Sequence, residues 1–381
     1  MGGFLTFDGG ADEEAVRRAA EAAGWCAFGA AGEGDGVGEG GGVDDAGGRL
    51  RVFDLHCDTL DRLALAGDFT APGGFAQHDA NVPRSRLSSL ADNDAHVSLA
   101  RTRAFSWCQC FAVFVPDEVA GDAAWALFQR VRRFWEAQLK EHATRVGQVR
   151  AMAEADATLD SGRTAGMLSV EGLSFLEPGG AAEARLDALA EAGVRMATLV
   201  WNGQSAIGGG CIAGGGLTPF GRACVRELEL RGIVVDTSHL SDEGFKDLCD
   251  AASRPFAASH SNARAVCGHP RNLADWQLRE MADRGGVVGL NFCRDFLSDA
   301  HADPTPDDVL RQVDHILETA GEDVLALGSD YDGCDVPSWL DPCDKAGDLH
   351  GLLVREFGRP VADKAFFGNA RAFFERAAGA A

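Results

Sequence analysis

The residues best suited to chemistry in this chain are histidines and carboxylates at the ends of short apolar segments. The first such segment begins at Val52 and ends in the sequence HCDT, which contains His56 and Asp58. In a strand, residues i and i+2 point to the same face, so these two side chains would project together. Imidazole nitrogen and carboxylate oxygen are both good ligands for an ion such as Zn²⁺. One His-x-Asp pair is weak evidence for a metal site, because such pairs are common.

Four later apolar segments end in side chains of the same kinds. They carry Glu171, His239, His260 and Asp330, within the sequences SVEG, DTSH, ASH and GSD. Five strand ends in one register are what a single polynuclear site requires. Two ions could be held if one carboxylate bridges them, and Glu171 is the natural bridge because its strand lies between the others. Two such cations can share a hydroxide and polarise a carbonyl group, and Asp330 would then handle the proton.

The segments that would position these residues alternate between strand-like and helix-like patterns. Strands are predicted at 51–57, 105–115, 165–171, 195–201, 232–238, 255–259, 286–292 and 324–329. Helices are predicted at 122–142, 181–192, 219–231, 242–251, 275–283 and 307–320, with N-caps at Thr218 and Ser241. Eight apolar strands separated by crossover helices imply a parallel sheet that is covered on both faces. Eight units in roughly 320 residues favour an α/β fold of the (β/α)8 TIM-like barrel type, with active-site residues at the carboxyl ends of the strands.

An open doubly wound sheet is the alternative fold. It would place a glycine-rich phosphate-binding turn after the first strand, and HCDT does not resemble one. Residues 1–48 are predicted to form a short appendage with one helix at 12–23 and a Gly-rich acidic linker at 31–42. The main domain would then span 49–381.

Composition excludes several classes of partner. The net charge is -23, from 58 acidic and 35 basic residues, which argues against nucleic acid or an anionic membrane as a partner. No apolar run approaches the roughly 20 residues of a membrane helix, and the start of the chain lacks the pattern of a signal peptide. The 11 cysteines show no paired C-x2-C spacing. We therefore expect reduced thiols in a cytoplasmic protein.

Several blocks of the sequence resemble the membrane dipeptidase (renal dipeptidase-like) family of zinc metallopeptidases. These blocks are HCDT, SVEG, DTSHLSDEGF, ASHSNARAVCGHPRN and GSDYDG, and the resemblance extends from about residue 50 to 375. It implies a (β/α)8 fold, hydrolysis of dipeptides, two Zn²⁺ ions per chain and often a homodimer. It also implies that His56 and Asp58 bind one zinc, that His239 and His260 bind the second, and that Glu171 bridges the two.

The same resemblance assigns roles around the substrate. Arg271 matches the arginine that grips the substrate's carboxylate, which suits the paired geometry of guanidinium and carboxylate. Asp330 matches the general acid and base. Many members of the family carry a His after the fourth strand that contacts the developing oxyanion, whereas this chain has Trp201 there. We predict that Trp201 and Asn202 contact the substrate, with Asn202 as a replacement hydrogen-bond donor.

Two other functions fit parts of the pattern. One is a related metal-dependent amidohydrolase that acts on a cyclic amide, a β-lactam or an N-acyl amino acid. Such barrels often use His-x-His and a modified Lys, whereas this chain has His-x-Asp and a Glu. The other is a catalytically silent metal-binding barrel, which would not need Asp330 or Arg271. Asp332 is predicted to form a turn or to position a ligand, His269 to be structural, and the remaining histidines to be ordinary: His78, His96, His142, His301, His315 and His350.

Overall fold

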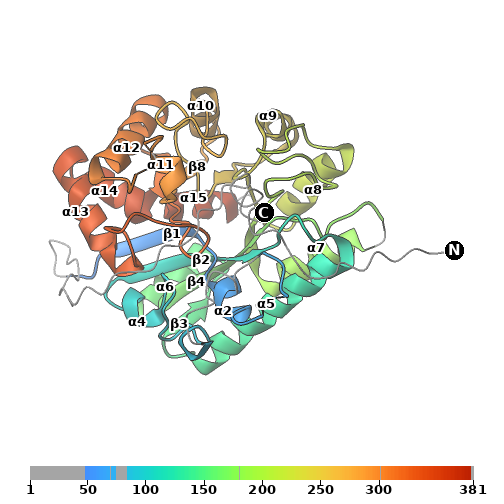
Figure 1. The fold of residues 1–381 in the computed structure, drawn as a ribbon, viewed down its shortest axis with the longest axis horizontal. Helices are drawn as coiled ribbons and strands as arrows, with labels where there is room; N and C mark the ends of the chain where they lie inside the picture. The colour runs from blue at the N-terminus through green and yellow to red at the C-terminus, as the bar shows by residue number, and fades with distance from the viewer. Residues whose placement is uncertain (1–47, 69, 74–83, 180, 301, 379–381) are drawn as a thin grey trace, which may run out of the picture.

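Eight parallel strands form a closed barrel at the centre of the computed structural model, which describes residues 48–68, 70–73, 84–179, 181–300 and 302–378 (Figure 1). The barrel strands are β1 (Arg51–Cys57), β2 (Ser106–Phe114), β4 (Thr164–Glu171), β5 (Val194–Thr198), β6 (Val234–Asp236), β7 (Ala257–Ala258), β8 (Val287–Leu290) and β9 (Leu325–Leu327). Each strand pairs with the next in this order, and β1 pairs with both β2 and β9, which closes the ring. The predicted TIM-like barrel is confirmed. All eight strands lie where the sequence placed them, and the predicted 1–48 appendage lies outside the described residues except for Gly48.

A ninth strand, β3 (Val146–Gln148), was missed by the sequence prediction. It pairs with the first half of β4, where Val146 is the partner of Thr164. Further along, from Leu168 onward, β4 pairs with β5 instead. The segment Val-Gly-Gln contains one apolar residue, so it has neither the length nor the alternation that would indicate a strand.

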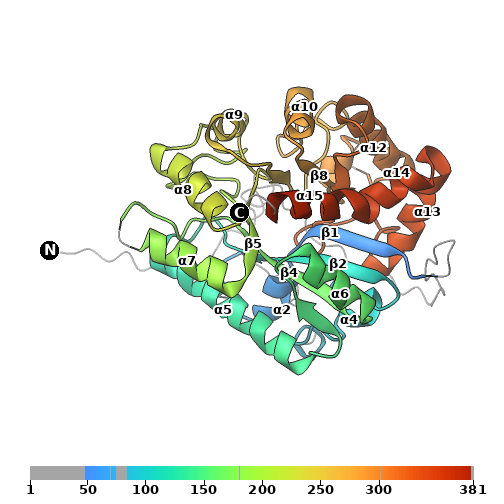
Figure 2. The same cartoon turned by 180° about the vertical axis from the view of Figure 1, so that it is seen from behind.

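Helices surround the barrel (Figures 1 and 2). They are α2 (Thr59–Ala64), α4 (Leu99–Thr102), α5 (Gly121–Glu141), α6 (Met152–Asp160), α7 (Ala182–Ala192), α8 (Pro219–Leu230), α9 (Asp242–Ala251), α10 (Asp275–Asp283), α11 (Arg294–Leu297), α12 (Pro306–Ala320), α13 (Ala346–Phe357), α14 (Arg359–Asp363) and α15 (Asn369–Ala378). The six helices predicted between 122 and 320 are present to within one residue at each end. Two of them begin at the predicted caps, where the hydroxyls of Thr218 and Ser241 accept hydrogen bonds from Gly221 N and Gly244 N.

Helix α15 packs across the end of the barrel where the strands begin (Figure 2). Phe53 of β1 is fully buried there, and its ring centroid lies 5.5 Å from that of Phe374 and 6.1 Å from that of Phe367. Apolar side chains therefore fill this end. The polar residues of the barrel interior are left to the opposite end, where the strands finish.

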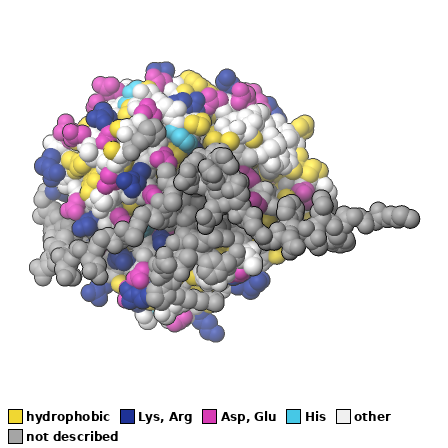
Figure 3. All heavy atoms as spheres, in the orientation of Figure 1, with side chains coloured by type: hydrophobic (Ala, Val, Ile, Leu, Met, Phe, Trp, Pro, Cys, Tyr) yellow, Lys and Arg dark blue, Asp and Glu magenta, His cyan; other side chains and the backbone are white. Residues whose placement is uncertain are grey.

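The surface carries mixed charge. Figure 3 shows acidic, basic and apolar side chains interspersed over the visible described part of one face. Among the helices that the structure describes, none is both long enough and apolar enough to cross a membrane.

Candidate metal centre and active site

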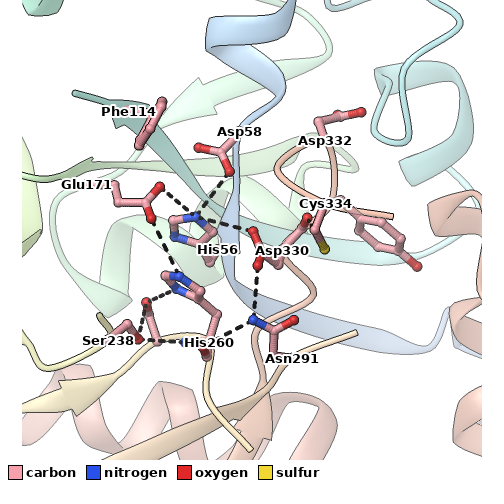
Figure 4. A network of polar contacts seen from close by, with 12 residues as sticks. His56, Asp58, Phe114, Glu171, Ser238, His260, Asn291, Asp330, Asp332 and Cys334 are labelled. Atoms are coloured by element: carbon pink, nitrogen blue, oxygen red, sulfur yellow. Dashed lines mark hydrogen bonds and ion pairs between the residues drawn. The ribbon is translucent and has the colours of Figure 1, made fainter. Parts of the chain in front are cut away.

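The five predicted metal ligands converge at the carboxyl end of the barrel. Figure 4 shows His56, Asp58, Glu171 and His260 of this set. Nε2 of His56 lies 3.4 Å from Asp58 Oδ2 and 3.4 Å from Glu171 Oε2. The other oxygen of Glu171, Oε1, lies 2.7 Å from His239 Nε2 and 3.7 Å from His260 Nε2. All five side chains are buried. The two oxygens of Glu171 thus face two different groups of nitrogen and oxygen atoms, which is the arrangement that a bridging carboxylate requires.

Two of the site residues leave their strands through an uncommon backbone turn. His239 has φ of 69° and Asp330 has φ of 62°, values that residues other than glycine seldom adopt. Each such residue costs on the order of 1–3 kcal/mol, and residues of this kind cluster at functional sites. Hydrogen bonds hold the second turn in place, since Asp330 N donates to His56 O (3.2 Å) and Asp58 N donates to Tyr331 O (2.9 Å).

The atoms that face one another in this cluster are mostly acceptors. Nδ1 of His239 lies 2.8 Å from Asn202 Oδ1, which can only accept, so the ring proton is on Nδ1 and Nε2 presents its lone pair. That nitrogen is 3.0 Å from His260 Nε2. Nε2 of His56 and Oδ1 of Asp58 are buried and have no hydrogen-bond partner among the described residues. Buried nitrogen and oxygen atoms that face each other without a hydrogen-bond partner fit divalent cations, because a cation satisfies several of them at once.

The charges of the cluster also fit a cation site. Burial, with the nearby Asp58 carboxylate, raises the pKa of Glu171 to about 8. Burial lowers the pKa of His239 and of His260 well below the usual range, and positively charged neighbours add to this, so both rings are neutral as ligands must be. Burial also opposes a charge on His56, but the carboxylates of Asp58 and Glu171 outweigh it and raise the pKa of this ring. A bound cation would take the place of that proton.

Asp330 lies at the edge of the cluster. Its Oδ1 is 3.9 Å from His56 Nε2, and its Oδ2 accepts a hydrogen bond of 3.0 Å from Nδ2 of Asn291, which follows β8. His56, His260 and Asp330 also come close enough together to hold an ion. The position of Asp330 therefore suits either proton transfer at the centre or a share in binding a metal.

Arg271 is buried with much of its guanidinium unused. Nη2 donates to the backbone oxygen of His260 at 3.3 Å, whereas Nε and Nη1 have no hydrogen-bond partner among the described residues. The guanidinium carbon lies 5.4 Å from the ring centroid of Phe296. His269, predicted to be structural, accepts a hydrogen bond on Nδ1 from Arg271 N at 3.2 Å. A buried cation with free N–H groups is suited to bind an anion such as a carboxylate.

Trp201 and Asn202 both lie at the mouth of the barrel. The Trp201 ring centroid is 5.1 Å from that of Phe114 and 6.1 Å from that of His239, so it walls the site. Oδ1 of Asn202 accepts from His239 Nδ1 and from Cys211 Sγ (3.3 Å). Asn202 therefore orients a candidate ligand, and its predicted contact with substrate stays a prediction.

A glycine is required at position 210, where the loop after β5 passes close to the backbone of Trp201 and Asn202. A Cβ at Gly210 would lie 1.9 Å from the backbone oxygen of Trp201. Gly210 N donates to Gly203 O at 2.7 Å, and Cys211 N donates to His239 O at 2.7 Å. The loop that carries Cys211 is thereby held against both Asn202 and His239.

Sequence reasoning missed the polar residues beneath the ligands. Asp54, in the middle of β1, accepts from Ser329 N (2.8 Å), from Ser329 Oγ (2.6 Å) and from Gln109 Nε2 (3.0 Å). Asp236, at the end of β6, makes a similar set of contacts with Ser259. The only signal in the sequence is an Asp two or three residues before a candidate His, which is too common to be specific.

Asp332 holds the turn after β9, as predicted. Its carboxylate accepts from Arg62 Nη1 (2.7 Å), from His96 N (2.7 Å) and from the Thr59 hydroxyl. These contacts tie the turn to α2 and to the segment before α4. The ring nitrogens of the other described histidines lie within hydrogen-bond distance of nearby side chains: Ser89 for His142, Asp275 for His315 and Asp363 for His350.

Known proteins are similar to this chain in sequence and in fold. The family model for membrane dipeptidase (peptidase family M19) matches residues 48–371. An uncharacterized protein in the pqqA 5' region of Klebsiella pneumoniae is 39% identical over 178 residues, which are 44% of this chain and 64% of that protein. An uncharacterized dipeptidase of Schizosaccharomyces pombe is 35% identical over 198 residues, which are 50% of this chain and 47% of that protein. The matches thus span about half to two thirds of these relatives.

Solved structures of metallopeptidases are similar to this chain in fold. A dipeptidase described as a metallopeptidase of family M19 is 27% identical with a TM-score of 0.76, over 87% of this chain and 99% of the other. A metallopeptidase from Rhodobacter sphaeroides, solved with a phosphinate mimic of the dipeptide L-Ala-D-Ala, is 26% identical with a TM-score of 0.75, over 86% and 99%. The family model matches most of the length of this chain. The chain therefore belongs to the membrane dipeptidase family (peptidase family M19), a family of metallo-dipeptidases.

Proposed function

We propose that this chain is a zinc-dependent dipeptidase that uses two Zn²⁺ ions. The observation that carries the proposal is the position of Glu171, whose two carboxylate oxygens face His56 on one side and the His239–His260 pair on the other. His56 and Asp58 would hold one ion, the other two histidines the second, and Glu171 both. When bound, the ions would polarise the scissile carbonyl and make water a better nucleophile near neutral pH.

The residues of this chain would supply binding, orientation and proton transfer. Arg271 would bind the free carboxylate of the dipeptide through its unused Nε and Nη1 groups. Asp330 would accept a proton from the attacking water and deliver it to the leaving amine, with Asn291 holding its Oδ2 at 3.0 Å. Trp201, next to Phe114, would wall the site and limit the entry of bulk water. The Rhodobacter sphaeroides relative supports a dipeptide as the substrate, because it was solved with a dipeptide mimic.

Every residue of this proposal lies in the barrel domain, 49–381. The activity is therefore assigned to that domain and not to residues 1–48. A homodimer, which the family resemblance implies, stays a prediction.

Turnover of a small panel of substrates by zinc-loaded enzyme tests the function. We expect free dipeptides to be cleaved, and their C-terminal amides, N-acyl amino acids and a β-lactam to be cleaved much more slowly. Preferential cleavage of an N-acyl amino acid or of a cyclic amide would favour the amidohydrolase alternative. Tight zinc binding without turnover of any of these compounds would favour a silent metal-binding barrel.

A further inference from the structure

A chain of short hydrogen bonds runs from Asp236 through Ser259 to the ring of His260. Oγ of Ser259 lies 2.5 Å from Asp236 Oδ2 and 2.7 Å from His260 Nδ1. Asp236 is buried and receives three further contacts, from Ser238 N (3.1 Å), Ser259 N (2.8 Å) and Thr198 Oγ1 (2.6 Å). These contacts tie the ends of β5, β6 and β7 together directly beneath the proposed metal centre.

The chemistry of these groups fixes the direction of the protons. The two backbone N–H groups can only donate, and both point to Oδ1 of Asp236. In its carboxylate form Asp236 can only accept, so the hydroxyl of Ser259 gives its single proton to Oδ2. Oγ of Ser259 is then left with lone pairs only toward His260. Nδ1 of His260 must carry the ring proton in order to complete the bond.

We propose that Asp236 is a positioning residue that, through Ser259, keeps the ring proton of His260 on Nδ1, so that Nε2 presents its lone pair to the metal centre. The link from this tautomer to metal binding rests on the proposed function. The hydrogen-bond chain and the tautomer that it selects do not. Metal-ligating histidines commonly donate their other ring N–H to an outer partner in this way.

Two further observations support the inference. Nε2 of His260 faces inward, 3.0 Å from His239 Nε2 and 3.7 Å from Glu171 Oε1, so a proton on Nε2 would take up the space of the ion. The backbone of His260 is held independently of the ring. Its N–H donates to Ser238 Oγ (3.1 Å), and its oxygen accepts from Arg271 and Asn291. The hydrogen bonds from Asp236 through Ser259 therefore select the tautomer of His260 and are not needed to hold its backbone.

Replacement of Asp236 by Asn should reverse the chain without a change in its shape. The amide oxygen can still accept from the two backbone N–H groups. The new NH₂ group must donate to Ser259 Oγ. The proton of Ser259 then turns toward His260 Nδ1, at 2.7 Å, in preference to the more distant Ser238 Oγ, at 3.3 Å. The ring proton of His260 would be displaced to Nε2, where it blocks metal binding.

Nitrogen NMR of metal-free protein tests this directly. Two-bond ¹⁵N–¹H correlation spectra of ¹⁵N-histidine-labelled protein distinguish the two tautomers, and His260→Gln identifies the His260 signals. We expect the Nδ1–H tautomer in the unmodified chain and the Nε2–H tautomer in Asp236→Asn. Zinc affinity, measured by competition with a chromophoric chelator, should fall by about 10- to 100-fold in that variant. Thr198→Val, which removes a donor to the same oxygen but adds none, should keep the Nδ1–H tautomer.

The same spectra can overturn the inference. An Nε2–H tautomer in the unmodified chain would do so, and so would an unchanged tautomer in folded Asp236→Asn. If that variant does not fold, Ser259→Ala removes the middle of the chain and should give a mixture of tautomers, whereas a single Nδ1–H form there would contradict the role. The tautomer is measured without metal or substrate, so the two proposals can fail separately. If Asp236→Asn reverses the tautomer but the unmodified, zinc-loaded enzyme cleaves no dipeptide, the proposed function is rejected and this inference stands.

Discussion

Oε1 of Glu171 lies 2.7 Å from Nε2 of His239. The other carboxylate oxygen faces His56 at 3.4 Å, so this one residue joins the two halves of the site. Glu171→Gln should lower the occupancy of both ions together. His239→Ala, which removes a ligand from one half, should mainly deplete one ion.

Elemental analysis of the purified variants measures this difference. Glu183→Gln, at an exposed position in the first turn of α7, is a matched control that should keep both ions. Loss of a single ion from Glu171→Gln would mean that Glu171 is not a bridge.

Metal binding should depend on pH through Glu171. Its pKa is raised from 4.5 to about 8 in the metal-free site by burial and by Asp58. Between these values the folded chain holds a proton that the unfolded chain has lost, so this group makes the metal-free protein less stable as pH rises through that window. Zinc competes with the same proton, and its affinity should therefore rise with pH through that window.

Calorimetric titrations with zinc in buffers of different ionisation enthalpy, from about pH 6 to 9, would count the protons released. Glu171→Gln should release fewer protons than the unmodified chain. An affinity that does not change with pH would contradict the proton competition at this residue.

Binding of the substrate's carboxylate by Arg271 can be tested separately from the chemical step. Because Nε and Nη1 of this buried guanidinium are free to bind a carboxylate, Arg271→Ala should cost about 2–5 kcal/mol in kcat/KM, or roughly 30- to 4,000-fold. Amidation of the dipeptide's C-terminus should cause a similar loss in the unmodified enzyme. In Arg271→Ala the same amidation should change the rate little, because the partner of the carboxylate has already been removed. Equal rates for the free acid and the amide in the unmodified enzyme would show that the carboxylate is not bound there.

Replacement of Asp330 should lower kcat and leave the amount of bound metal unchanged. Asp330→Asn should lower kcat by about 10²- to 10⁴-fold, as expected for loss of general acid–base catalysis. Asn291→Ala, which removes the 3.0 Å hydrogen bond to Oδ2, should lower kcat in the same direction but less. Steady-state kinetics with metal analysis of the same samples would check both. Loss of an ion from Asp330→Asn would instead make Asp330 a ligand, together with His56 and His260.

The convergence of the candidate ligands could be predicted from the sequence, because parallel strands bring their carboxyl ends to one edge of the barrel. His56, Glu171 and His260 each end an apolar segment, so their residue types and positions in the chain were enough to place them together. The role of Asp236 was not visible, because it depends on the register of β6 against β7, in which Asp236 pairs with Ala257. The orientation of Asn202 depends on a loop contact from Cys211. The short strand β3 lacked any local pattern.

Zinc titration of metal-free enzyme, with hydrolysis of a free dipeptide such as L-Ala-L-Ala as the readout, tests the central claim most directly. We expect no turnover without metal and a maximal rate when two equivalents of zinc are bound per chain, because in the proposed function Glu171 is shared by two ions. Full turnover at one equivalent, turnover that does not depend on metal, or no dipeptide hydrolysis at two equivalents would contradict a two-zinc dipeptidase.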